Sequence, residues 1–228
     1  RGAAPARPPA RAPGEGAGVS KGGGAGVRAR GALASGPGAG QAGARGAGSG
    51  QEGAMARLAF WFDYASTYSH LAAMRIEGEA AARGVAVAWR PFLLGPIFGA
   101  QGWRDSPFNL YPAKGRNMWR DMDRQAAKHG LAPVRRPEPF PQHSLLAARA
   151  TLALPEALRG AFAVEVFRAE FERGEDVSDP GVIAAALRAA GAPAPAEVLA
   201  ATQETAVKDA LKAEGARAAE LGLYGAPS

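Results

Sequence analysis

The sequence predicts an α/β protein that opens with a βαβ unit and continues into a large all-helical block. Two short apolar runs, 58–62 and 85–92, have the length and composition of buried strands. A helical pattern lies between these runs, and a long stretch with apolar residues at helical spacing follows them. The order strand, helix, strand favours two parallel strands in one sheet, because the crossover helix returns the chain right-handedly.

Residues 1–54 differ in composition from the rest of the chain. They hold 17 of the 31 glycines and 7 of the 27 basic residues, and they contain no aromatic residue. Side chains this small cannot bury enough apolar surface to offset chain entropy, so we expect a disordered tail. Translated upstream sequence before a true start at Met55 explains the tail better than a transit peptide, which would be richer in serine and more amphipathic.

Charge and cysteine content exclude several functions for residues 55–228. These residues carry 20 basic and 19 acidic side chains, which leaves no obvious single-sign surface for nucleic acid. The absence of cysteine excludes a disulfide framework and a dithiol redox pair, and three scattered histidines do not suggest a metal site. No membrane span or secretory signal is recognisable. We therefore expect a soluble, cytoplasmic protein that binds neither nucleic acid nor membranes.

Local signals justify the first elements in order. The apolar run 58–62 ends at Asp63, and Ser66 then stands where a helix N-cap belongs. Gly84 stands where a glycine would stop the helix, directly before the second strand at 85–92.

The segment from about Lys114 to Leu223 is predicted to be helical throughout. Glycine and proline divide it into five or six helices, and apolar residues form rows at helical spacing. The rows are Trp119, Met122 and Ala126, and Leu158, Phe162 and Val166. Because a two-stranded sheet is marginal, we expect further strands beyond the last residue, Ser228, and interpret the chain as truncated.

The turn between the first strand and its helix is the candidate site. Backbone N–H groups and the positive end of the helix dipole favour an anion there. Ser66 and Ser69 add two hydroxyl groups about one turn apart. Alternatively, Ser66 is only a helix cap, worth about 1 kcal/mol. A catalytic triad is disfavoured because no G-x-S-x-G motif surrounds either serine.

The run 60–69, FWFDYASTYS, resembles the opening of 2-hydroxychromene-2-carboxylate isomerases and kappa-class glutathione transferases. Matching stretches follow in the family's order at 90–95, 109–114, 119–121 and 225–227. The resemblance implies a thioredoxin-like fold with an inserted helical domain. Ser66-Thr67-Tyr68-Ser69 then falls where thiol oxidoreductases of this fold carry Cys-x-x-Cys.

This resemblance implies the domain boundaries. Residues 1–54 are the tail, which we do not expect in the native protein, and 55–98 form the thioredoxin-like βαβ part. Residues 99–205 form the helical insertion, and 206–228 return to the thioredoxin-like domain and end at its cis-proline loop. The strands that follow this loop in the family, with an acidic pair that anchors the γ-glutamyl group, are missing.

The resemblance also implies site residues. Ser66 would be the catalytic residue that donates a hydrogen bond to the sulfur of glutathione. Asn109 and Lys114 would hold the peptide part of glutathione, and Ala226 and Pro227 would form the cis-proline loop beside its cysteinyl moiety. Without the family pattern, these residues could equally be a loop-capping amide, a solvated lysine and an ordinary turn proline.

Two departures from the family's motif concern the first helix. Thr67 replaces the usual proline, and His70 replaces the usual tyrosine. His70 could contact an acidic substrate, although a partly exposed histidine without a catalytic role is the better expectation.

The resemblance therefore implies a glutathione-dependent isomerase that interconverts 2-hydroxychromene-2-carboxylate and trans-o-hydroxybenzylidenepyruvate in aromatic catabolism. The alternatives are a kappa-type glutathione transferase or peroxidase acting on other electrophiles, and a non-catalytic thioredoxin-like binding module. We expect no metal, a small-molecule substrate with glutathione as cofactor, and a possible homodimer. A chain ending at Ser228 should be less stable and less active than a longer one.

Overall fold

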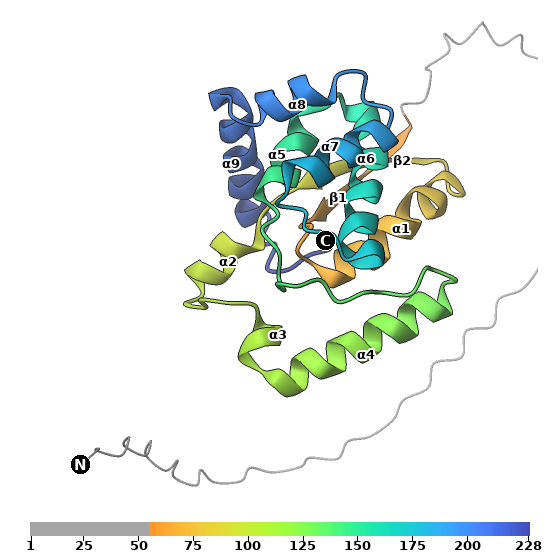
Figure 1. Cartoon of the computed structure of the whole chain (residues 1–228), viewed down its shortest axis with the longest axis vertical. Helices are drawn as coiled ribbons and strands as arrows, with labels where there is room; N and C mark the ends of the chain where they lie inside the picture. The colour runs from red at the N-terminus through yellow and green to blue at the C-terminus, as the bar shows by residue number, and fades with distance from the viewer. Residues whose placement is uncertain (1–54) are drawn as a thin grey trace, which may run out of the picture. The chain divides into compact units, whose positions relative to one another are not determined.

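Two parallel strands form the sheet in the part of the chain that the structure describes. This structure, a computed structural model, describes residues 55–228, so the disorder expected for 1–54 lies outside the described residues (Figure 1). Strands β1 (Ala56–Phe62) and β2 (Val85–Pro91) pair in parallel, with Phe60 opposite Trp89. The βαβ prediction is confirmed.

Helix α1 (Thr67–Ala81) connects the two strands and begins where its cap was predicted. The Ser66 side chain accepts a hydrogen bond from the backbone N–H of Ser69, which satisfies one of the free donors of the first turn. At the other end, Gly84 adopts a φ of 64°, a left-handed conformation that favours glycine. Both sequence signals for this helix are confirmed.

The sheet buries aromatic side chains on both of its faces. Phe60 and Phe62 pack with Trp89 and, on one face, against residues of helices α5 (Leu145–Ala153), α6 (Glu156–Arg168) and α7 (Pro180–Ala189). Trp61 points to the opposite face, where it meets Phe92 and Ala218 of α9 (Thr205–Glu220). Alternation along β1 therefore divides the core between two layers of helices.

Helix α4 (Pro112–Lys128) packs against α1 through a smaller apolar cluster. Met118, Met122 and Ala126 are buried there against Leu71. Two members of the predicted row, Met122 and Ala126, are thus buried, while the third, Trp119, is only partly buried beside them. Figure 1 shows α4 following α3 (Pro107–Leu110) on the side of the sheet where both strands end. No helix within residues 55–228 is long and apolar enough to cross a membrane.

The expectation that the segment from Lys114 to Leu223 consists of helices with short breaks is wrong for residues 129–144. This segment runs as an irregular loop between α4 and α5 (Figure 1). Four prolines at 133, 137, 139 and 141 explain the difference, since proline lacks the N–H that a helix interior needs. The remaining elements are α2 (Leu94–Ala100), the π-helical turn η1 (Ala169–Arg173) and α8 (Pro195–Ala201).

The last residues return to the sheet beside β1. Trp61 and Ser228 exchange two backbone hydrogen bonds, N to O distances of 2.9 and 3.0 Å, in the manner of an antiparallel pair. This pairing holds the preceding residues, Ala226 and Pro227, next to the start of α1.

Candidate active site

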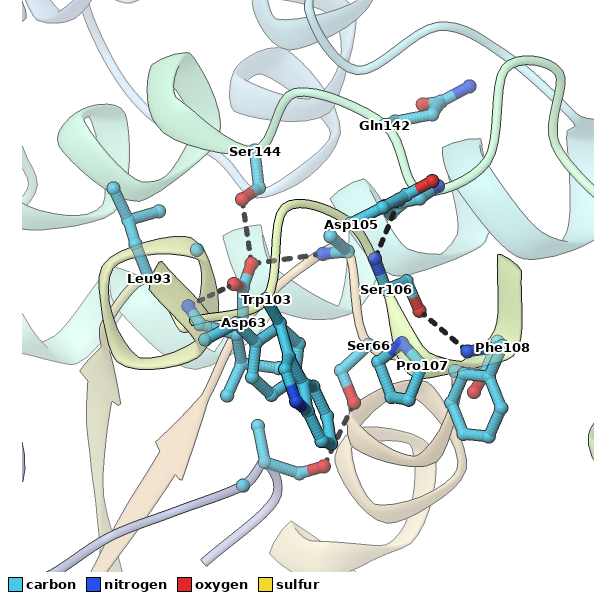
Figure 2. Close-up of a pocket in the computed structure, with 18 of the residues that line it drawn as sticks. Asp63, Ser66, Leu93, Trp103, Asp105, Ser106, Pro107, Phe108, Gln142 and Ser144 are labelled. Carbon is cyan, nitrogen blue, oxygen red and sulfur yellow. Dashed lines mark hydrogen bonds between the residues drawn. The ribbon is translucent and has the colours of Figure 1, made fainter. Parts of the chain in front are cut away.

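A cavity of about 600 Å³ opens at the carboxyl ends of β1 and β2. Its walls come from the turn before α1, the loop after β2, the segment leading into α3, the first turn of α4, the loop before α5 and the residues before Pro227. Ligands of open α/β sheets bind at this end of the strands, and the volume is in the usual range for small-molecule sites. Figure 2 shows the lining residues.

Ser66 lies at the junction of these walls. Its hydroxyl donates to the backbone carbonyl oxygen of Ala226 at an O–O distance of 3.0 Å (Figure 2). The same oxygen accepts from Ser69 N–H at 3.2 Å. The bond between Ala226 and Pro227 is cis, as predicted. The hydroxyl proton of Ser66 is therefore directed toward the cis-proline loop, at the N-terminus of α1 where the helix dipole favours negative charge.

Lys114 and Arg104 supply positive charge to the cavity. Lys114 is exposed in the first turn of α4, with its Nζ atom 5.9 Å from the ring centroid of Phe108. Both cations line the cavity together with His143, whereas the carboxylates in the lining are Asp63 and Asp105. The exposed cations can bind a carboxylate of a ligand.

Of the predicted site residues, Ser66, Lys114 and Ala226 line the cavity, whereas Asn109 and Pro227 do not. Asn109 makes contacts of another kind. Its amide donates to both carboxylate oxygens of Asp105, at 3.1 and 3.2 Å, and to the carbonyl of Phe140 at 2.9 Å. The amide thus ties α3 to the loop before α5. In this structure its role is to hold two walls together.

Ser69 and His70 point away from the cavity. Ser69 and His70 are both fully buried, so the expectation of a partly exposed histidine is wrong, and the two serine hydroxyls do not face one region. The imidazole of His70 packs on Phe167 and Phe171 because α6 and η1 cover this side of α1. Burial, with the nearby charge of Arg168, lowers the pKa of His70 to about 4.

Asp63 is a lining residue that sequence reasoning treated only as the end of a strand. It accepts hydrogen bonds from Leu94 N–H at 2.7 Å, Ala65 N–H at 3.1 Å and the hydroxyl of Ser144 at 2.6 Å (Figure 2). Burial raises its pKa, against the lowering effect of these bonds. One carboxyl group thus joins the turn after β1, the loop after β2 and the start of α5.

Other walls of the cavity were also missed. Trp103, Ser106 and Pro107 line it from the segment before α3, and Gln142 and His143 line it from the loop before α5. The sequence signal for the wall at Gln142 and His143 is the proline cluster at 133–141, which marks an irregular loop of the kind that carries functional residues.

In this structure a polar residue, Ser66, lies at the N-terminus of the helix after the first strand and faces a cis-proline. The βαβ sheet that carries both is covered by a helical block. Together these features are typical of thioredoxin-like proteins. Residues 57–228 match the family described as a DSBA-like thioredoxin domain. The chain belongs to this family, and the helical block is its insertion in the thioredoxin-like fold.

Solved structures with the same fold include enzymes of two kinds. A 2-hydroxychromene-2-carboxylate isomerase is 20% identical over 75% of this chain and 83% of its own, with a TM-score of 0.68. A probable DsbA oxidoreductase from Streptomyces coelicolor is 23% identical over 75% and 78%, with a TM-score of 0.58. The cytosolic disulfide reductase DsbM from Pseudomonas aeruginosa, solved with GSH, is 17% identical over 75% and 83%, with a TM-score of 0.53. Among curated proteins none matches the chain.

Proposed function

We propose that this protein is a glutathione-dependent isomerase that interconverts 2-hydroxychromene-2-carboxylate and trans-o-hydroxybenzylidenepyruvate. The observation that carries the proposal is the hydroxyl of Ser66, which donates toward the cis-proline loop at the N-terminus of α1 in a chain without cysteine. A disulfide oxidoreductase needs thiols of its own. A chain that has none needs a thiol from a bound molecule.

The residues of the cavity fit glutathione. A volume of about 600 Å³ accommodates a tripeptide beside a small aromatic acid. Ser66 would donate to the sulfur, Ala226 and Pro227 would flank the cysteinyl backbone, and Lys114 would bind a carboxylate. Thr67 also lines the cavity, while its hydroxyl is shielded from solvent and has no hydrogen-bond partner among residues 55–228. Asn109 supports the binding surface by holding the loop at Phe140.

Glutathione would supply the nucleophilic sulfur whose reversible addition lets a conjugated double bond rotate. The protein makes that sulfur anionic at neutral pH. A hydrogen bond from Ser66 to a charged acceptor contributes about 1.5–3 kcal/mol, which lowers a thiol pKa by about 1–2 units. Arg104 and Lys114 bind and orient the carboxylate of the substrate at the mouth of the cavity. A cytoplasmic location agrees with this proposal, because reduced glutathione is maintained there.

The titration of bound glutathione tests the role of Ser66. In Ser66→Ala, the apparent pKa of the bound thiol, followed by thiolate absorbance, should rise by about 1–2 units, and the rate of isomerisation should fall by about 10- to 100-fold. Ser69→Ala is the matched control, because this hydroxyl is fully buried outside the lining. Whatever its effect on stability, Ser69→Ala should leave the pKa of the bound thiol at the wild-type value.

Three results would count against the proposal. An unchanged pKa of the bound thiol in Ser66→Ala would show that Ser66 acts only as a helix cap. Turnover of standard transferase electrophiles without turnover of the chromene would assign the same site to a kappa-type glutathione transferase, and glutathione binding with neither activity would leave a binding module.

A further inference from the structure

A second cavity, of about 680 Å³, lies between α2, α5 and α9. Leu93, Pro96, Leu145 and Tyr224 belong to the walls of both cavities, so the second adjoins the first. Neither Ser66 nor Lys114 lines the second cavity. The second cavity is lined mainly by apolar groups, including Ile97 and Leu211, and its volume suits a small organic ligand.

The charged residues that line this second cavity are all basic. They are Arg149 from α5 and Lys208 and Lys212 from α9. Lys212 is paired with Asp209 at 2.8 Å, which leaves Arg149 and Lys208 as the cations without a carboxylate partner among the described residues. A groove with apolar walls and unpaired cations is complementary to an anion with a large apolar part.

Arg149 gives the second observation. It is half-buried, and its Nε atom is fully shielded from solvent without any hydrogen-bond partner within residues 55–228. A ligand in the cavity cannot reach the shielded Nε atom, but the Nη atoms of Arg149 are not shielded and likewise have no hydrogen-bond partner among residues 55–228, so they can donate to a ligand oxygen. A carboxylate fits the planar donor set of arginine better than any neutral group does.

We propose that this second cavity binds an amphiphilic organic anion, with a carboxylate on Arg149 and Lys208 and an apolar chain or ring along the groove between α2 and α9. The site is separate from the proposed glutathione site and does not depend on the isomerase activity. Neutral ligands would leave both cations unpaired, and compact inorganic anions would leave the apolar walls uncovered.

Calorimetric titration of the full chain with dodecanoate tests this site. We expect one saturable site, and an at least tenfold weaker interaction with dodecanol, which has the same chain without the charge. Arg149→Met should raise the Kd for dodecanoate about 10- to 100-fold, whereas Arg149→Lys should recover part of the affinity. Arg188→Met is the matched control, because Arg188 is an exposed arginine on α7 outside the cavity, and it should bind as the wild type does.

Lys208→Met, on the partly exposed surface of α9, should weaken dodecanoate binding severalfold and provides the test if Arg149→Met fails to fold. Lys114→Met and saturating glutathione should leave dodecanoate binding unchanged, since both concern the first cavity. The proposal is overturned if dodecanoate does not bind saturably, if dodecanol binds equally well, if either a folded Arg149→Met or Lys208→Met binds as the wild type does, or if glutathione displaces dodecanoate. A dimer whose interface covers the groove and blocks dodecanoate would also overturn it.

Discussion

Replacement of His70 by leucine should remove an acid-dependent loss of stability. The imidazole is fully buried, with ring centroids 5.2 Å from Phe171 and 6.1 Å from Phe167. Neither ring nitrogen has a hydrogen-bond partner among the described residues. Leucine has a similar volume and no polar atom, so it should be accommodated in this apolar site.

The size of the effect follows from the pKa of His70. Burial, with Arg168 nearby, lowers it from 6.5 to about 4, so the folded state stays neutral where the unfolded chain takes up a proton. Above the pKa of histidine in the unfolded chain, His70 is neutral in both states and costs no stability. As the pH falls from about 6.5 to 4, only the unfolded chain takes up the proton, so the free energy of unfolding decreases. Between pH 8 and pH 5 the loss from this residue amounts to about 2 kcal/mol.

Urea denaturation of wild type and His70→Leu from pH 8 to pH 5 measures this difference. The fully buried Glu170 acts in the opposite direction, because burial raises its pKa and makes the folded state the stronger proton binder. Glu170 is present in both proteins, so its effect cancels when the two pH profiles are subtracted. The exposed His143 is the matched control, and His143→Leu should keep the wild-type profile. Equal acid sensitivity in wild type and His70→Leu would refute the reasoning.

Three further changes should have measurable effects. Gly115→Ala would place a methyl group against the backbone carbonyl of Phe108, so it should lower the free energy of unfolding by about 1–3 kcal/mol in urea and weaken glutathione binding. Gly160→Ala would bring Cβ within 2.6 Å of Trp89 Nε1 and should lower the Tm while leaving the Kd for glutathione unchanged. Asp63→Asn replaces an acceptor oxygen of the carboxyl group that joins three walls of the cavity by an amide N–H donor, so calorimetry should show about tenfold weaker glutathione binding.

Local sequence signals determined the first third of the fold. The apolar run 58–62, the cap at Ser66 and the stop at Gly84 each act within a few residues, so the strand–helix–strand order follows from the sequence alone. The cis bond before Pro227 was also expected, although only through the resemblance to a family.

The resemblance to a family pointed to Ser66, Lys114 and Ala226, and the structure places all three in the lining of one cavity. Their chemical roles stay predictions. Asn109 shows that a residue at a position matching the family's motif does not necessarily face the ligand. Whether its amide faces the cavity depends on Asp105 and Phe140, and the latter is 31 residues away along the chain.

Only the tertiary structure decided which polar residues near the first turn are buried and which line a cavity. His70 and Ser69 are covered by α6 and η1, which are about 90 or more residues further along the chain. Asp63 acquires its partner Ser144 across 81 residues, and Arg149 and Lys208 line one cavity only because α5 packs on α9. Periodicity and capping report on neighbours within one or two turns, whereas these environments depend on how distant helices pack, which no local pattern encodes.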